Sequence, residues 1–315
     1  MKAVYQKGAY PTMITPYRAD GSVDLETVEK YVYWYHEAGC DGIFAVCQSS
    51  EIFQLSLEER AAINETVWNT VQKIAAEGGR RMTVVSSGHV SDSIDDQARE
   101  LCRIAETGTD ALILITNRLD LNQEGDDVWI ANAERLLAQL PDDVALGLYE
   151  CPYPYKRLLT PRILRWCLET GRFRFIKDTC CDAAVIAERL DILRGSDLWL
   201  FNANCQTLLQ SLRDGGAGYC GIMANYHPAL YVWLCHRFEA EPARASLLQS
   251  VLCMAGFTEG GLPYPLTAKY HMCLEGIATE SSTRKPGCGP MTDYDRDCVR
   301  QMRLLTKALE EEYLK

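Results

Sequence analysis

Short apolar runs alternate with amphipathic segments along most of this chain. The runs are the length of buried strands, and the longer segments between them carry apolar residues at helical spacing, as at Val28, Tyr31, Val32 and Tyr35. The predicted strands are 9–15, 42–46, 82–86, 111–115, 145–149, 173–177, 198–202 and 218–223. The predicted helices between them are 24–38, 56–77, 91–107, 126–139, 161–170, 182–194 and 204–214.

Local signals support the helix boundaries. Ser56 and Glu59 have the spacing of a capping box, and Thr160 precedes a proline at the first helical position. Glycines follow three predicted helices, at positions 39, 108 and 171.

Eight strands alternating with helices predict a (β/α)8 TIM barrel. Further helices are expected at 228–239, 243–256, 264–276 and 293–313. We therefore expect a barrel core over 1–227, and an eighth helix with a C-terminal helical extension over 228–315 packed on it as one unit. The alternative is an open doubly wound sheet, which normally carries a Gly-rich phosphate turn after its first strand. Here that position reads Thr15-Pro16-Tyr17-Arg18.

Composition narrows the class of protein. The chain has 47% hydrophobic and 24% charged residues, which is typical of a globular protein. Its net charge is −11, and it contains no run of Lys or Arg. This argues against nucleic-acid and membrane-surface binding. The opening MKAVYQKGAYPTMITPY lacks an apolar signal core, so we expect a cytoplasmic protein. The 14 cysteines include no C-x-x-C pair, so no metal site is expected.

In a barrel, chemistry lies at the carboxyl ends of the strands. The sixth predicted strand ends at Lys177, and a buried neutral amine can attack a ketone to form a Schiff base. The fifth ends at Tyr149, whose phenol could shuttle a proton. Taken singly, each has an ordinary alternative: a lysine reaching solvent and an aromatic residue at the barrel rim.

The loop after the second strand reads Gln48-Ser49-Ser50-Glu51. Its hydroxyls and amides suit a substrate carboxylate, although a solvated loop of turn-forming residues would look the same. Glu51 could instead be a structural hydrogen-bond acceptor beneath the loop.

Taken together, these features resemble the dihydrodipicolinate synthase / N-acetylneuraminate lyase family over nearly the whole chain. The motifs that carry the resemblance are Gly8 to Pro16, Asp20-Gly21-Ser22-Val23-Asp24, Ser49 and Glu51, Leu55 to Arg60, Tyr149 with Pro152, Ile176-Lys177, Ala224-Asn225 with Pro228, and Pro265, Lys269, Arg284 and Pro286.

The resemblance implies roles for several residues. Lys177 would form the Schiff base and Tyr149 would shuttle the proton. Ser49, helped by the Ser50 amide, would hold the carboxylate of a 2-oxo acid, and Cys220 on the eighth strand would offer a backbone carbonyl. It also implies no metal or organic cofactor, and a homotetramer built as a dimer of dimers.

The chain departs from the family at positions that select the substrate. The synthases use a threonine and two tyrosines as a proton relay. In this chain Gln48 occupies the position of the threonine, and Arg118 occupies that of the second tyrosine. Pro154 occupies the position of the arginine that binds the second substrate's carboxylate in the synthases. Cys205-Gln206 replaces the Asp-Glu pair of sialic acid lyases, whereas Thr179 resembles the lyases. Neither dihydrodipicolinate synthesis nor sialic acid cleavage is therefore expected.

Other polar residues near the strand ends have two interpretations each. Arg118 could bind a distal carboxylate or lie on the surface. Asn202, Asn204 and Gln206 could contact substrate hydroxyls or cap the seventh helix. His227 is expected to be structural, and His89 is a weaker candidate for a contact at the rim.

The sequence thus predicts a class I aldolase or lyase that acts on pyruvate or a 2-keto-3-deoxy sugar acid, with an aldehyde as the other partner. Two alternatives remain open. One is a 2-keto-3-deoxy sugar acid dehydratase using the same imine, and the other is a non-catalytic barrel that binds 2-oxo acids.

Overall fold

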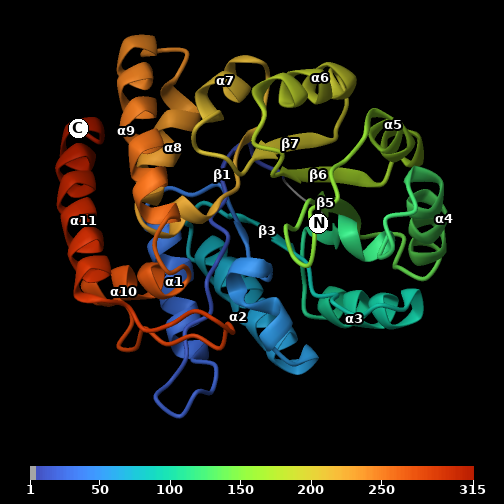
Figure 1. Cartoon of the computed structure of the whole chain (residues 1–315), viewed down its shortest axis with the longest axis horizontal. Helices are drawn as coiled ribbons and strands as arrows, with labels where there is room; N and C mark the ends of the chain where they lie inside the picture. Colours follow the sequence, from blue (N-terminus) through green and yellow to red (C-terminus); the bar gives the residue numbers. More distant parts are fainter. Residues whose placement is uncertain (1–4) are drawn as a thin grey trace.

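Eight parallel strands form a barrel, and helices alternate with them along the chain (Figure 1). The computed structural model describes residues 5–315, so the first four residues of the opening segment lie outside the described residues. The strands follow the order β1-β8-β7-β6-β5-β4-β3-β2 around the sheet. They are β1 (Gly8–Ala9), β2 (Gly42–Phe44), β3 (Thr83–Ser86), β4 (Ala111–Ile115), β5 (Ala145–Tyr149), β6 (Phe173–Asp178), β7 (Trp199–Asn202) and β8 (Gly218–Tyr219).

The ring closes between β1 and β2 through the segment that follows β1. Thr12 and Phe44 form an isolated parallel bridge. The Phe44 amide donates to the Pro11 carbonyl at 3.0 Å, and the Met13 amide donates to the Phe44 carbonyl at 3.0 Å. This nearly closed arrangement confirms the predicted (β/α)8 barrel and excludes the open doubly wound sheet.

Strands β1 and β8 are shorter than the predicted 9–15 and 218–223. They pair at Gly8 and Gly218, whose φ angles are 140° and 152°. A Cβ on Gly218 would overlap the Gly8 carbonyl, so only glycine permits this close approach. The chain then leaves the sheet for the 3-10 turn η4 (Ile222–Asn225), and Cys220 follows β8 instead of lying on it.

Seven helices occupy the predicted positions between the strands. They are α1 (Leu25–Glu37), α2 (Leu57–Ala76), α3 (Ile94–Glu106), α4 (Asp126–Leu137), α5 (Pro161–Thr170), α6 (Ala183–Leu193) and α7 (Leu208–Arg213). The capping box at Ser56 and Glu59 is confirmed by its two reciprocal hydrogen bonds of 2.8 and 3.2 Å. The three glycines after helices have positive φ, as predicted for helix ends.

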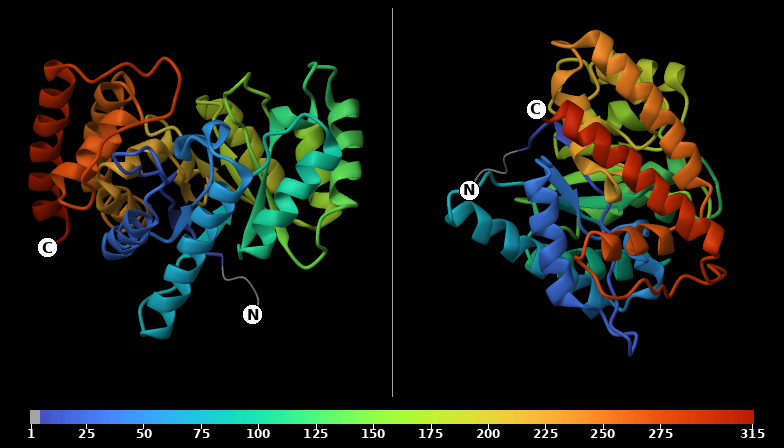
Figure 2. Two further views of the ribbon diagram at one scale, coloured as in Figure 1. Left: turned by 90° about the horizontal axis from the view of Figure 1, so that it is seen from below. Right: turned by 90° about the vertical axis from the view of Figure 1, so that its left-hand side faces the viewer.

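Four more helices follow β8, and the last of them lies across the side of the molecule (Figure 2). They are α8 (Pro228–Arg237), α9 (Pro242–Gly260), α10 (Leu266–Leu274) and α11 (Asp293–Tyr313). Helix α8 packs against β1, and α11 packs against α8, α9 and α10. None of the helices within residues 5–315 has the length and apolar character needed to cross a membrane.

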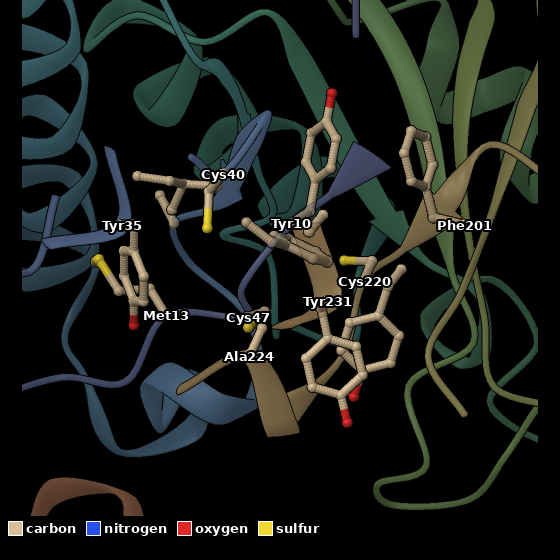
Figure 3. Packing of buried hydrophobic residues seen from close by; sticks show 14 of the residues in the cluster. Tyr10, Met13, Tyr35, Cys40, Cys47, Phe201, Cys220, Ala224 and Tyr231 are labelled. Atoms are coloured by element: carbon tan, nitrogen blue, oxygen red, sulfur yellow. The ribbon is translucent and has the colours of Figure 1, made fainter. Parts of the chain in front are cut away.

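The apolar core has an inner and an outer layer, because successive strand residues point to opposite faces. Tyr10, Phe175 and Phe201 fill the barrel interior, where the Phe175 and Phe201 rings stack with centroids 4.5 Å apart (Figure 3 shows Tyr10 and Phe201). The outer layer, beneath the helices, includes Leu148, Ile176 and Leu200. The aromatic layer inside the barrel forms the floor beneath the inward-facing residues at the strand ends.

Candidate active site

A cavity of about 450 Å³ opens at the carboxyl ends of the strands. Its lining comes from the ends of β5 and β6 and from the loops after β2, β7 and β8. The segments before and after α10 complete it. The C-terminal extension therefore helps to enclose the cavity at the functional end of the barrel.

Lys177 and Tyr149 lie side by side in this cavity. They are paired positions of β6 and β5, and Lys177 points inward because it follows Phe175 by two residues. The Lys177 Nζ lies 4.2 Å from the centre of the Tyr149 ring and 5.6 Å from that of Phe44. The lysine is only 3% exposed. Among the residues that the structure describes, no hydrogen-bond or ion-pair partner holds its Nζ.

The Tyr149 hydroxyl donates a hydrogen bond to the Gln48 Oε1 at 3.3 Å. Burial raises the pKa of Tyr149 well above its ordinary value, so the phenol is protonated near neutral pH. An amide oxygen accepts a hydrogen bond but has no proton of its own to pass on. Gln48 can therefore orient the phenol, but it cannot relay the phenol's proton as a hydroxyl would.

Two buried thiols lie near Lys177, behind the cavity lining. Burial raises the pKa of Cys151 to about 11 and that of Cys220 to about 12, so both stay neutral near pH 7. The Cys151 Sγ lies 3.6 Å from the Gln48 Oε1. Neither thiol therefore supplies a counter-charge for Lys177 near neutral pH.

The loop after β2 turns one serine toward the cavity and the other away from it. Ser49 lines the cavity and donates to the Thr12 Oγ1 at 3.1 Å. Ser50 donates its hydroxyl to the Met13 carbonyl at 2.6 Å and its amide to the Cys47 carbonyl at 3.0 Å. The Ser50 amide is thus used within the turn η1 (Gln48–Ser50) and is not aimed at the cavity.

The contacts of Glu51 agree with the interpretation that it is a structural hydrogen-bond acceptor. Its Oε1 pairs with the Lys269 ammonium on α10, and its Oε2 accepts from the Thr283 hydroxyl at 2.8 Å and the Arg284 amide at 2.6 Å. Desolvation lowers the pKa of Lys269 to about 8. Glu51 therefore ties the loop between α10 and α11 to the rim of the active site.

A buried ion triad lies behind the ends of β5 and β6. Arg189 on α6 pairs with Glu150 at 2.7 Å and with Asp178, and all three side chains are at most 2% exposed. Glu150 also accepts from the Thr179 amide at 2.9 Å, and the Thr179 hydroxyl donates to the Glu150 carbonyl at 2.6 Å. The triad fixes the strand ends that carry Tyr149 and Lys177, and Thr179 lines the cavity as expected.

The side chains after β7 combine a cavity contact with local capping. Asn204 lines the cavity, accepts from the Thr207 amide at 2.9 Å and donates to the Gln206 Oε1 at 2.7 Å. Asn202 donates to the Thr207 hydroxyl at 2.9 Å, which supports the capping alternative. Gln206 is not part of the cavity lining, and neither is Cys220, although its neighbour Gly221 is.

Arg118 lies away from the Lys177 cavity. Its guanidinium donates to the Val90 carbonyl at 3.0 Å and pairs with Asp92 at 2.9 Å. It lines a separate cavity between α3 and α4. Arg118 belongs to the 3-10 segment (Thr116–Leu119) directly after β4 and is only 9% exposed, so it is neither a residue of the Lys177 cavity nor an exposed surface arginine.

Both histidines near the strand ends are buried. The Nε2 of His89 accepts from the Ile115 amide at 2.7 Å, so its Nδ1 carries the proton toward Gln97 at 3.0 Å. His89 is therefore part of the core and not a contact at the rim. His227 lies 3.6 Å from Glu259, and burial lowers its pKa to about 3, in agreement with a structural role.

Several residues of the cavity were not singled out from the sequence, among them Tyr264, Lys156 and Lys285. The Tyr264 hydroxyl accepts from the Asn225 Nδ2 at 3.2 Å. Tyr264 and Lys285 flank Pro265 and Pro286, which carried part of the family resemblance and were the available signal. No three His, Cys, Asp or Glu side chains within residues 5–315 converge to hold a metal ion.

The geometry defines a (β/α)8 barrel whose cavity is built around a buried lysine and a tyrosine at the strand ends. A model of the dihydrodipicolinate synthetase family matches residues 6–119. A 4-hydroxy-tetrahydrodipicolinate synthase of Saccharophagus degradans is 25% identical over 294 residues, which cover 85% of this chain and 96% of that protein.

Solved structures agree with the fold. A catalytic-lysine mutant of the Ruminococcus gnavus sialic acid aldolase superposes with a TM-score of 0.85 at 17% identity and covers 98% of each chain. A prophage protein of the dihydrodipicolinic acid synthase family from E. coli K12, in complex with pyruvate, has a TM-score of 0.82 at 20% identity and covers 96% of this chain and 98% of that one. A dihydrodipicolinate synthase variant described as the first monomeric one has a TM-score of 0.84 at 17% identity and covers 98% of this chain and 99% of that one.

These comparisons confirm the predicted resemblance to the dihydrodipicolinate synthase / N-acetylneuraminate lyase family. At the level of this family, they support an enzyme of the lyase type.

Proposed function

We propose that this protein is a class I lyase in which the Lys177 Nζ forms an imine with the C2 carbonyl of a 2-oxo acid. The substrate is pyruvate or a 2-keto-3-deoxy sugar acid, and the enzyme makes or breaks the C3–C4 bond, whose C3 atom is attached to the former carbonyl carbon C2. The observation that carries the proposal is the placement of Lys177, buried, without a partner among the described side chains, and 4.2 Å from the centre of the Tyr149 ring.

The chemistry follows from these groups. The neutral amine adds to the ketone, and the resulting carbinolamine loses water, with the Tyr149 hydroxyl passing the proton to the leaving oxygen. In the cleavage direction, the Tyr149 phenolate left by that step takes the proton of the C4 hydroxyl, the C3–C4 bond breaks, and the protonated imine accepts its electron pair to give an enamine and an aldehyde. Protonation of the enamine at C3 and hydrolysis then release the 2-oxo acid and free the lysine. The imine itself is the electron sink, so the proposal includes no metal or organic cofactor.

Ser49 and Thr179 both line the cavity. The Thr179 hydroxyl is held by the Glu150 carbonyl at 2.6 Å, so the donor for the carboxylate of the 2-oxo acid is the Ser49 hydroxyl, which exchanges its 3.1 Å hydrogen bond to Thr12 for one to the substrate. Ser50 supports this role indirectly, because its hydrogen bonds to the Met13 carbonyl and within the turn hold the loop that presents Ser49.

We further propose that the physiological reaction is neither dihydrodipicolinate synthesis nor sialic acid cleavage. Gln48 offers an amide and Arg118 a guanidinium at the two positions where the relay needs a hydroxyl. Pro154 provides no guanidinium for a second carboxylate, and Gln206 does not line the cavity as a sugar-binding acid would.

A dehydratase on a 2-keto-3-deoxy sugar acid is the second candidate, because the same imine can expel water instead of an aldehyde. A screen of such acids that follows pyruvate release separates the two, since a dehydratase leaves the carbon chain intact. A non-catalytic binding barrel is the third candidate, and the juxtaposition of Lys177 and Tyr149 argues against it because binding alone requires neither.

The family resemblance also supports a homotetramer built from dimers, although one similar solved structure is described as monomeric. Light scattering on the purified chain tests this part of the proposal directly.

The test of the enzymatic proposal is reduction with borohydride in the presence of pyruvate, followed by measurement of the intact protein mass. We expect a covalent adduct in the wild type and none in Lys177→Ala, which should keep the fold but lose turnover. Turnover that survives in Lys177→Ala refutes the assigned role, and a wild type that gives no adduct with any 2-oxo acid favours the binding barrel.

A further inference from the structure

Two lysines besides Lys177 reach the mouth of the active-site cavity, and neither has a carboxylate partner. The Lys156 Nζ donates to the Thr179 carbonyl at 2.7 Å, and the Lys285 Nζ donates to the Tyr264 carbonyl at 3.1 Å. Over the described part of the chain, no acidic side chain lies within ion-pair distance of either ammonium. A carbonyl oxygen satisfies a hydrogen bond without cancelling a charge, so both cations remain available to an anion.

The segment that carries Lys156 is held in place by residues that follow β4. The Asn117 Nδ2 lies 2.6 to 2.9 Å from three carbonyl oxygens between residues 151 and 155, and its two hydrogens are shared among them. Arg157, the next residue, pairs with the buried Asp120 at 2.9 Å. Lys156 is therefore an exposed side chain on a fixed backbone at the cavity rim.

Lys285 is positioned by its neighbour Arg284. The Arg284 guanidinium binds both carboxylate oxygens of Glu59, at 2.8 and 3.0 Å, and lies 4.7 Å from the centre of the Tyr17 ring. The Arg284 amide donates to Glu51 at 2.6 Å. These contacts anchor the loop between α10 and α11, which places Lys285 in the cavity lining.

The charge of the cavity is opposite to that of the molecule. Besides Lys177, two lysines line it, and the only carboxylate in its described lining is Glu51, which is already paired with Lys269. The chain as a whole carries a net charge of −11. A positive mouth on an acidic protein concentrates anionic ligands at the cavity against the long-range repulsion of the remaining surface.

We propose that Lys156 and Lys285 bind a distal anionic group of the substrate, a carboxylate or a phosphate, while the 2-oxo acid end is held at Lys177. This inference rests on the proposed imine chemistry and deepens it by naming the substrate class as 2-oxo acids with a second negative group. Two lysines act as point charges on flexible stems, so the chemistry is common to carboxylates and phosphates, and the test must separate them.

Two matched pairs of ligands make that separation. 2-Oxoglutarate and 2-oxopentanoate differ in a distal carboxylate, and 2-keto-3-deoxy-6-phosphogluconate and 2-keto-3-deoxygluconate differ in a phosphate. The readout is the ligand concentration that gives half-maximal borohydride trapping at Lys177. We expect the anionic member of at least one pair to trap at a roughly tenfold lower concentration in the wild type, and that pair identifies the group.

Variants of the two lysines assign the preference. The preference is the ratio of the two trapping concentrations within a ligand pair. Lys156→Gln and Lys285→Gln should each reduce this preference about threefold, and the double variant should abolish it while still trapping pyruvate. Lys156→Arg should retain it, because the charge remains. Lys30→Gln, at an exposed lysine of α1 outside the cavity lining, should leave it unchanged.

Two results would overturn the inference. One is equal trapping of both members of each pair by the wild type, and the other is a preference that persists in the double variant. If pyruvate still traps in either case, the proposed function stands and only the anion subsite is lost. If no 2-oxo acid traps at all, the imine chemistry fails, and the substrate class inferred from it is overturned as well.

Discussion

Tyr149 and Lys177 occupy paired positions on neighbouring strands, and the Nζ of the lysine lies 4.2 Å from the centre of the tyrosine ring. The ring packs edge-on against Phe44 with a centroid distance of 5.6 Å, while its hydroxyl is directed to Gln48. The ring and the hydroxyl of Tyr149 thus make different contacts. The ring packs against the lysine, and the hydroxyl, oriented by its hydrogen bond to Gln48, can exchange a proton with a substrate in the cavity.

Replacement of Tyr149 by phenylalanine keeps the ring and removes the hydroxyl. We expect turnover to fall about 10²- to 10⁴-fold, which is the range for loss of a general acid–base group. The pyruvate adduct at Lys177 should still form, but more slowly. Steady-state kinetics and the time course of trapping check this, and turnover within twofold of the wild type would show that the phenol moves no proton.

Gln48→Leu removes the acceptor of the Tyr149 hydroxyl and leaves the phenol in place. Because the hydrogen bond only orients the phenol, we expect a loss in kcat of about fivefold, the equivalent of about 1 kcal/mol. In Tyr149→Phe the same change should have little further effect. A double-mutant cycle on kcat measures this coupling, and effects that simply multiply would mean that the two side chains act independently.

Arg189→Met should destabilise the protein by about 3–5 kcal/mol, because it leaves the buried Glu150 and Asp178 without their counter-charge. The strand ends behind Tyr149 and Lys177 should loosen in the same variant. Denaturant unfolding at pH 7 gives the stability change.

The matched control is Arg162→Met. Arg162 pairs with Asp127, but both side chains are more than half exposed, so the loss should be at most about 1 kcal/mol. Similar losses in the two variants would show that the buried triad contributes no more than a surface ion pair.

His236 on α8 gives a pH-dependent contribution to stability. Its Nε2 lies 3.0 Å from the Asp41 carboxylate, and this contact raises the pKa of His236 above its ordinary value of 6.5. A group whose pKa is higher in the folded state stabilises the fold fully below the unfolded pKa, and this contribution is lost as the pH rises through the folded pKa.

We therefore expect the stability difference between wild type and His236→Asn to be larger at pH 5.5 than at pH 8.5. The ring is 46% exposed, so the change should stay below about 1 kcal/mol. Urea midpoints at the two pH values measure it, and a difference that grows toward high pH would contradict the assigned ion pair.

Much of the barrel could be predicted because its signals are local. The boundaries of α5 and α11 and of β4 and β5 agree with the predicted 161–170, 293–313, 111–115 and 145–149. The first and last strands were predicted too long. They pair with each other over two residues each, Gly8 with Gly218 and Ala9 with Tyr219, and this pairing between distant segments leaves no periodicity within either one.

The site was less predictable than the fold. Lys177 and Tyr149 could be found because strand ends of a barrel meet at one face. The position of Arg118 could not be predicted, because it depends on the direction of a short 3-10 turn. The role of Arg189 had a signal, a charged residue on the apolar face that includes Ile186 and Leu190. Tyr264 and Lys285 reach the cavity only through long-range packing of the C-terminal segments.

The most direct test of the account is to map the residue that borohydride fixes to pyruvate, since three lysines share one cavity. The reduced protein is digested, and the modified peptide is identified by mass spectrometry in the wild type, in Lys177→Ala and in the Lys156→Gln, Lys285→Gln double variant. We predict modification at Lys177 alone in the wild type and the double variant, and none in Lys177→Ala. Modification at Lys156 or Lys285 with Lys177 unmodified, or a wild type that is not modified at all, would contradict the central claim.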